Sequence, residues 1–390
     1  MILVDAAVEK LSRSAPRANT APIWQRALES AEWVMHRLPE GSEYAVMLGD
    51  ESIDPDAASR WWRVGSEADA QRAFDALRAH GAPARDVDLA REIDAAMTLQ
   101  PLPERVVLIV GTLPGYPQDN GKRQLAALKS SVRHLKPRVA IDVLLMPVLS
   151  YDGVAPAYWE LALKTGGSLL TVGSDWPTVT KDGLGDTEYA VFVVDVSGSM
   201  HQFGWSRARK RIEEVLQSLR NLRFFQVVSD LGEPLFGKDS LWVEATTERT
   251  NAAFGLLANW HVASKSTPTD GLVVAIEQAR SVAHASVYLL GDDLAELGEE
   301  RALQYLTEKL GPEGFGGIHV NTFALPSIFE ATGGDTYTQA DFAAFTFRLA
   351  VQTGGVVVGS PNRKAKNRRV VTAAPCDQVA SGTPRATASR

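Results

Sequence analysis

Short apolar runs alternate with amphipathic stretches along most of the chain. Residues 189–194 (YAVFVV) are continuously apolar, and the residues after them place Ile212, Val215, Leu216 and Leu219 at helical spacing. The alternation predicts further strands at 224–228, 241–243, 286–290, 318–324 and 356–358, and helices near 249–258, 271–283, 297–310 and 339–352. Continuously apolar strands separated by helices predict a mostly parallel sheet that helices cover on both faces.

The first part of the chain has the same pattern. It predicts strands at 2–4, 43–48, 60–64, 105–110, 138–146 and 168–172, and helices at 22–37, 66–79, 86–98, 121–135 and 155–164. Segments of the two parts match one another at offsets of 180 to 190 residues. The matched pairs are Gly49-Asp50 with Ser229-Asp230, Val106–Thr112 with Ser286–Asp292, Thr165-Gly166-Gly167 with Thr353-Gly354-Gly355, and Val4-Asp5 with Val194-Asp195. We therefore predict two tandem copies of one α/β domain.

Composition sets the predicted boundaries. The first copy covers residues 1–174, a linker rich in Gly, Asp and Thr covers 175–187, and the second copy covers 188–360. Residues 361–390 are rich in Ala, Ser, Thr and basic residues, and we predict that they are disordered. The length of 390 residues favours two domains, because one hydrophobic core seldom grows beyond ~250–300 residues.

Charge and hydropathy exclude several classes of function. The net charge of −7 argues against nucleic-acid binding, and the basic cluster at 363–369 is interpreted as part of the solvated tail. No apolar run approaches the ~20 residues that span a bilayer, so no membrane span is predicted. The single cysteine, Cys376, excludes an intrachain disulfide. No signal peptide is visible. The chain is expected in the cytoplasm if it is complete as written, and it is expected to be exported or membrane-tethered if an upstream segment is missing. The compartment therefore stays open.

The chemistry of the second copy gathers where its first strand ends. Asp195, Ser197 and Ser199 follow that strand at alternate positions, and the carboxyl ends of parallel strands line the crevice where open α/β sheets bind ligands. One carboxylate and two hydroxyls are hard oxygen donors, which suit Mg²⁺ or Mn²⁺ and not Zn²⁺. Scattered histidines offer no competing metal site.

The segment Asp195-Val196-Ser197-Gly198-Ser199 resembles the metal-ion-dependent adhesion site motif, DxSxS, of von Willebrand factor A domains. Residues 265–270 (KSTPTD) are similar to that family's threonine loop, and residues 289–293 (LLGDD) to its LLTDG strand end. The resemblance covers about 187–360. It implies two doubly wound Rossmann-like domains, each with a mostly parallel central sheet, one antiparallel edge strand and flanking helices.

The resemblance also implies a ligand set. Ser197, Ser199 and Thr267 would coordinate Mg²⁺, Mn²⁺ or Ca²⁺, Asp195 and Asp292 would act directly or through water, and an acidic side chain of a protein partner would fill the open position. Thr269 is a second candidate for the threonine, and Asp293 is a reserve carboxylate. Each element also has an ordinary interpretation as a turn or helix cap: Pro268 favours Thr267 as an N-cap, and Asp270 competes for that place.

The first copy lacks most of these ligands. Asp5 is retained, but Ala7 and Glu9 stand in place of the serines and Thr112 in place of the later aspartate. The loop at 81–86 contains no threonine. We interpret the first copy as a degenerate domain that packs or presents a partner surface.

Three functions remain open. The first is a metal-dependent protein-binding module without enzymatic activity. The second is a Mg²⁺-dependent phosphohydrolase of haloacid-dehalogenase type with Asp195 as nucleophile. That chemistry requires an aspartate at the position of Ser197, and Lys265 is only a loose match to the lysine that it uses. The sequence also contains no glycine-rich phosphate loop. The third is a scaffold whose metal is purely structural.

Overall fold

The computed structural model describes the greater part of the 390-residue chain. The described residues are 2–4, 21–36, 38, 41–49, 51–53, 62–63, 67–81, 89–111, 130, 139–146, 154–171, 187–200, 204–237, 241–260, 267–294, 298–327 and 337–361. The expected helix at 121–135 apart from Ser130, nearly all of the linker, the tail from residue 362, and Asp5, Ala7, Glu9 and Thr112 lie outside this part.

Strands and helices alternate as the hydrophobic pattern predicts. The strands are β1 (Ile2–Val4), β2 (Glu43–Tyr44), β3 (Val46–Leu48), β4 (Glu51–Ile53), β5 (Trp62–Arg63), β6 (Arg105–Val110), β7 (Ala140–Leu145), β8 (Leu169–Thr171), β9 (Tyr189–Val194), β10 (Phe224–Ser229), β11 (Val243–Glu244), β12 (Ala285–Gly291), β13 (His319–Ala324) and β14 (Val357–Gly359). The helices are α2 (Ala21–Met35), α3 (Glu67–His80), α4 (Leu89–Ala96), α6 (Val154–Thr165), α7 (Trp205–Ser218), α8 (Thr247–Ala258), α9 (Pro268–Arg280), α10 (Gly298–Leu310) and α12 (Tyr337–Thr353), with a 3₁₀ turn at Gly311–Glu313. The fold class is confirmed: it is α/β with a mostly parallel sheet. Strand β4 was not predicted, and the expected strand 43–48 is divided between β2 and β3.

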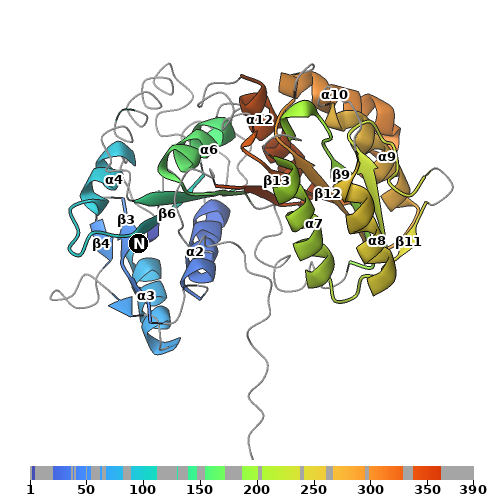
Figure 1. The fold of residues 1–390 in the computed structure, drawn as a ribbon. Coiled ribbons are helices and arrows are strands. Elements are labelled where there is room, and N and C mark those ends of the chain that lie inside the picture. Colours follow the sequence, from blue (N-terminus) through green and yellow to red (C-terminus); the bar gives the residue numbers. More distant parts are fainter. Residues whose placement is uncertain are drawn as a thin grey trace, which may run out of the picture.

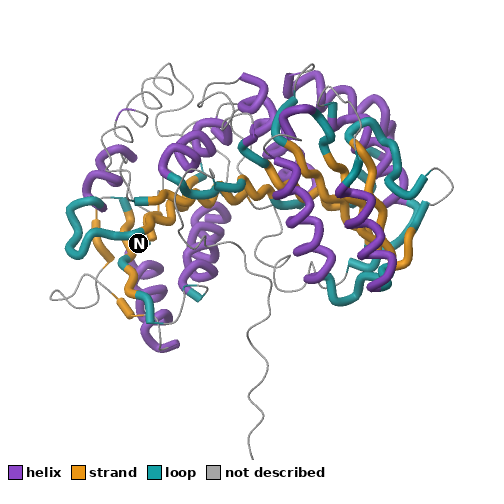
Figure 2. The backbone as a smooth tube through the Cα atoms, in the orientation of Figure 1, coloured by secondary structure: helices purple, strands orange, loops and turns teal. Residues whose placement is uncertain are grey.

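Most of the described strands form one continuous sheet, which runs through the whole molecule in Figures 1 and 2. Its order is β11-β10-β9-β12-β13-β14-β8-β7-β6-β1-β3-β4. The outermost strand at each end, β11 or β4, is antiparallel to its neighbour, and the strands between are parallel within each half. The halves meet where β14 pairs with β8 in antiparallel fashion, Val357 opposite Thr171. Read from its outer edge inward, each half therefore has the same order of strands.

Helices cover both faces of this sheet, as Figure 1 shows. On one face, α4, α6, α9, α10 and α12 enclose a single hydrophobic core that extends across both halves. On the opposite face, α2 and α3 cover the first half and α7 and α8 the second, each pair with its own core. Helices α6 and α12 lie side by side above the β8–β14 junction. The two halves thus share one buried layer and are not joined only by a linker. Among the described helices, none has the length and apolarity that crossing a bilayer would take.

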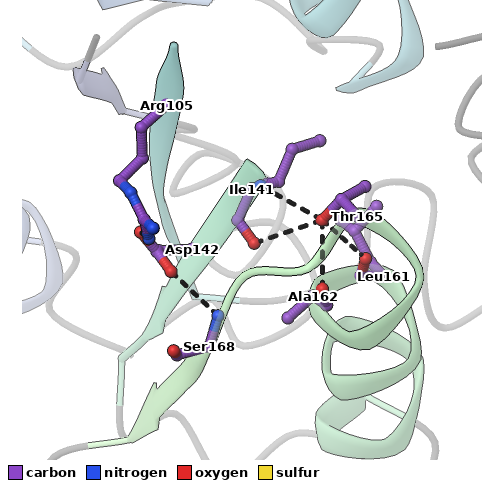
Figure 3. A network of polar contacts seen from close by, with 7 residues as sticks. All are labelled: Arg105, Ile141, Asp142, Leu161, Ala162, Thr165 and Ser168. Atoms are coloured by element: carbon purple, nitrogen blue, oxygen red, sulfur yellow. Dashed lines mark hydrogen bonds and ion pairs between the residues drawn. The ribbon is translucent and has the colours of Figure 1, made fainter. Parts of the chain in front are cut away.

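A network of hydrogen bonds fixes the end of α6 to the sheet (Figure 3). The Thr165 hydroxyl, 3.0 Å from the Leu161 carbonyl, accepts a hydrogen bond from the backbone N–H of Ile141 at 3.1 Å. The next residue, Asp142, accepts from the N–H of Ser168 at 2.8 Å. These bonds join the last turn of the helix, the start of β7 and the approach to β8.

The second half repeats this network. The Thr353 hydroxyl, 2.8 Å from the Leu349 carbonyl, accepts from the N–H of Val320 at 3.2 Å. The next residue, Asn321, accepts from the N–H of Val356 at 3.1 Å. The repeated Thr-Gly-Gly sequence therefore has the same physical role in both halves, where its threonine anchors the helix end to the strand beside it.

Sheet register gives the correspondence between the halves residue by residue. Val4 lies opposite Ile109, and Val194 lies opposite Leu290. Since Val4 corresponds to Val194, Ile109 corresponds to Leu290, and 290 − 109 gives an offset of 181 residues. The offset of 180 taken from sequence matches was wrong by one residue in this region, because identical glycines drew the match out of register.

Candidate metal centre

Two strand ends bring the first two carboxylates together. Asp195 follows β9 and Asp292 follows β12, and these strands are parallel neighbours in the sheet. The backbone N–H of Asp195 donates to the Leu290 carbonyl at 2.8 Å, which extends the ladder to the end of both strands. Both aspartates are fully buried. Gly291 makes this approach close, because a Cβ on it would lie only 3.4 Å from the Asp195 Cβ.

The two serine hydroxyls connect these carboxylates. The backbone N–H of Ser197 donates to Asp195 Oδ1 at 2.8 Å. The hydroxyls of Ser197 and Ser199 are 3.0 Å apart, and that of Ser199 donates to Asp292 Oδ1 at 3.2 Å. The structure therefore brings together four of the five residues of the predicted ligand set: Asp195, Ser197, Ser199 and Asp292.

The fifth residue, Thr267, stands at the N-cap of α9, directly before Pro268. Its side chain makes no capping hydrogen bond, so the hydroxyl of Thr267 does not cap the helix as the ordinary interpretation would require. Asp270 does not cap the helix either, because it lies in the first turn and accepts a hydrogen bond from Tyr305. The helix begins beside the centre, since the N–H of Gly271 donates to the Asp230 carbonyl at 2.8 Å. Thr269, the alternative threonine, is buried.

Two more carboxylates lie close to this pair. Oxygen atoms of Asp195, Asp292 and Asp293 all lie within 4.8 Å of one another, and all three side chains are buried. Asp230, which follows β10, is also fully buried and accepts from the N–H of Val196 at 3.3 Å. The sequence interpretation missed Asp230 as a site residue, although its position directly after the next apolar strand was the available signal.

Burial and mutual repulsion make Asp195 and Asp292 hard to ionise. Burial, and next the charge of Asp230, raise the pKa of Asp195 to about 7. Burial, followed by the charges of Asp195 and Asp293, raises the pKa of Asp292 well above its usual value. Oδ2 of Asp195 and Oδ2 of Asp292 accept no hydrogen bond from the described residues. Buried acceptors without donors, beside hard hydroxyl oxygens, fit a divalent cation, which would favour the ionised carboxylates in place of protons.

The first half has no such carboxylates at the corresponding described positions. With the offset of 181, Gly49 corresponds to Asp230 and Gly111 to Asp292. The N–H of Gly49 donates to the Val4 carbonyl, just as that of Asp230 donates to Val194. The expectation that Thr112 takes the place of the later aspartate is therefore corrected to Gly111. Glycine at both places supplies no side-chain oxygen.

The class that these observations define is a mixed α/β protein with a mostly parallel sheet and a buried aspartate cluster at the carboxyl edge of its second half. No protein-family model matches the chain, and no curated protein sequence matches it. Among solved structures, a von Willebrand factor type A protein from Catenulispora acidiphila is 16% identical with a TM-score of 0.34, over 46% of this chain and 39% of its own. Proximal thread matrix protein 1 from the mussel byssus is 13% identical with a TM-score of 0.32, over 88% of both chains. The match therefore spans less than half of the Catenulispora protein.

Proposed function

We propose that this chain is a metal-dependent protein-binding module whose second half carries a von Willebrand factor A-type adhesion site. The observation that carries the proposal is the chain of contacts from Asp195 through Ser197 and Ser199 to Asp292 at the ends of two neighbouring strands. Asp195, Ser197, Ser199, Thr267 and Asp292 would hold Mg²⁺, or Mn²⁺ or Ca²⁺ in its place. The bound ion supplies a centre of positive charge that attracts an acidic side chain of a protein partner.

We infer further that the two halves are tandem copies of one domain. The support is the common order of strands and the repeated hydrogen bonds of Thr165 and Thr353. A copy whose strand ends carry Gly49 and Gly111 has lost its ion-binding side chains and keeps its packing role. The boundaries proposed for the copies remain 1–174 and 188–360.

An enzymatic function is not proposed. Phosphoryl transfer with Asp195 as the nucleophile requires a second carboxylate two residues later, which acts as the general acid and base. That position holds Ser197, whose hydroxyl lies against the hydroxyl of Ser199.

Direct metal titration followed by partner capture tests the proposal. We expect Mn²⁺ to bind the purified full chain, and Asp292→Asn to weaken that binding by about 10- to 100-fold, because a ligand or its orienting group is lost. Asp94→Asn, which changes an exposed carboxylate on α4, is the control and should bind Mn²⁺ like the unchanged protein. A phosphatase assay with a generic phosphate ester runs in parallel, and turnover that Asp195→Asn abolishes would replace the binding proposal with the enzymatic one.

Capture on the immobilised protein then distinguishes a binding site from a structural ion. Proteins retained in Mg²⁺ should be released by EDTA and should not be retained by Asp292→Asn. Retention that ignores EDTA while Mn²⁺ still binds would favour a scaffold with a structural metal.

A further inference from the structure

Asp293 belongs to the buried aspartate cluster, although the sequence motif gives it no role there. Its carboxylate has an oxygen within 4.8 Å of ligand atoms of both Asp195 and Asp292. In the strand-end sequence that LLGDD resembles, the position after the aspartate is glycine, so this carboxylate is an addition of the present chain. The buried Oδ2 atoms of Asp195 and Asp292, which accept no hydrogen bond from any described residue, are an independent sign that the cluster suits a cation.

The number of oxygen donors around the pocket decides what Asp293 does. If each residue supplies one oxygen, the five residues of the predicted ligand set and Asp293 together offer six ligand atoms. Mg²⁺ prefers six oxygens in octahedral arrangement. A centre in which all six residues bind the ion has no position left for a partner.

We propose that Asp293 is a ligand of the bound ion in the free protein, at the coordination position that a partner's carboxylate takes, so that the partner binds by displacing Asp293. The proposal rests on the proposed function, because it concerns the same ion. In this arrangement the bound ion has no vacant coordination position in the free protein. Asp293 then competes with the carboxylate of any acidic partner for one position on the ion.

Burial favours Asp293 as the ligand that leaves. Asp195 and Asp292 are inaccessible to solvent. Asp293 is 7% exposed and follows Asp292 away from the end of β12. Of the three aspartates, only Asp293 has any solvent-exposed surface.

Charge favours exchange over addition. A divalent ion with three ionised carboxylates has a net charge of −1, and a fourth carboxylate would make this −2 in a buried pocket. Repulsion between like charges is strong where water is excluded. When a partner's carboxylate replaces that of Asp293, the net charge of the centre is unchanged.

The test counts the water molecules on the bound ion, with Mn²⁺ alone as the probe. Relaxation of water protons reports how many exchangeable waters Mn²⁺ holds. We expect Mn²⁺ on Asp293→Ala to hold about one water more than on the unchanged chain, since each lost oxygen ligand of an octahedral ion is replaced. Asp293→Asn, which preserves the shape of the side chain, covers the case in which Asp293→Ala fails to fold; its neutral amide should let acetate in more readily than the original carboxylate does.

Acetate then probes access to the same position. We expect acetate to displace water from Mn²⁺ on Asp293→Ala at about tenfold lower concentration than on the unchanged chain, as for loss of a competing ligand. Asp94→Asn is the control, because it changes an exposed carboxylate on α4 in the first half of the chain, and its water count should equal that of the unchanged chain.

The outcomes separate this inference from the function on which it rests. Equal water counts and equal acetate binding in Asp293→Ala and the unchanged chain would overturn the role of Asp293 while leaving the ion site intact. An absence of Mn²⁺ binding, or Mn²⁺ binding that persists in Asp195→Asn, would overturn the proposed function itself and this inference with it.

Discussion

The protein without divalent ions is expected to lose stability as the pH rises from about 4 to about 7, and Mg²⁺ is expected to restore it. The cause is the carboxylate cluster. In the unfolded chain Asp195 titrates near 3.8, whereas in the folded protein its pKa is about 7. Between these values the folded state retains a proton that the unfolded state has released, so the free energy of unfolding falls with pH and becomes level above about 7.

The magnitude follows from the size of the shift. Each pKa unit corresponds to ~1.4 kcal/mol, so Asp195 alone contributes on the order of 4 kcal/mol across this window. For a chain of this size that is a decrease of roughly 5–15 °C in melting temperature. The bound ion stabilises the ionised carboxylates, and we expect its effect to be largest at pH 8 and small at pH 4.

Thermal melts in EDTA and in Mg²⁺ at several pH values measure this effect. Asp195→Asn is the informative variant, because a neutral amide at the same place removes the proton that couples folding to pH. Its melting temperature should vary less with pH in EDTA and should respond less to Mg²⁺. Melting curves that coincide with and without Mg²⁺ at every pH would show that the cluster does not bind the ion.

The sequence predicts those residues of the candidate metal centre that directly follow a recognisable strand. Asp195 and Asp292 could be located because each is the first charged residue after a continuously apolar run, and such runs are buried strands. Asp230 also follows a mostly apolar strand, FFQVVS, but its contribution depends on strand order. Only the adjacency of β10 and β9 places Asp230 beside Asp195, and hydrophobic periodicity does not encode which strands are neighbours.

Asp293 illustrates a second limit. The sequence identifies a carboxylate next to Asp292, but successive residues in extended chain point in opposite directions. The inward position of Asp293 depends on the turn that the chain makes after β12, and no local pattern specifies that turn. The sequence therefore made Asp293 only a reserve carboxylate, with helix capping as its ordinary role, before the structure placed it in the cluster.

The joined sheet was beyond sequence reasoning for a different reason. It depends on the pairing of β8 with β14, two strands of three residues each that lie far apart in the chain. Their apolar pattern predicts that each strand is buried, and it is equally compatible with two separate sheets. The pairing is fixed by the shared core under α6 and α12, which is a property of the assembled layers and not of either strand.

The second large effect is expected from a single methyl group at Gly355. A Cβ on this residue would lie 2.0 Å from the carbonyl oxygen of Val320, far inside van der Waals contact. The close neighbour is a backbone atom of a central strand, so it cannot turn aside as the end of a long side chain would. Gly355→Ala should therefore lower the free energy of unfolding by at least ~3 kcal/mol, at the upper end of what overpacking causes.

The second Thr-Gly-Gly sequence, which contains Gly167, allows the same prediction to be tested in the first half of the chain. A Cβ on Gly167 would lie 1.9 Å from the Ile141 carbonyl oxygen, so Gly167→Ala should be as damaging as Gly355→Ala. Gly255→Ala is the matched control: no atom lies within 4 Å of its added Cβ, and inside α8 alanine should stabilise by about 0.5–1 kcal/mol. Urea unfolding of the three variants measures the differences. If Gly355→Ala or Gly167→Ala unfolded at the same urea concentration as Gly255→Ala, the helix end would not be held against the strand as closely as the repeated Thr-Gly-Gly network requires.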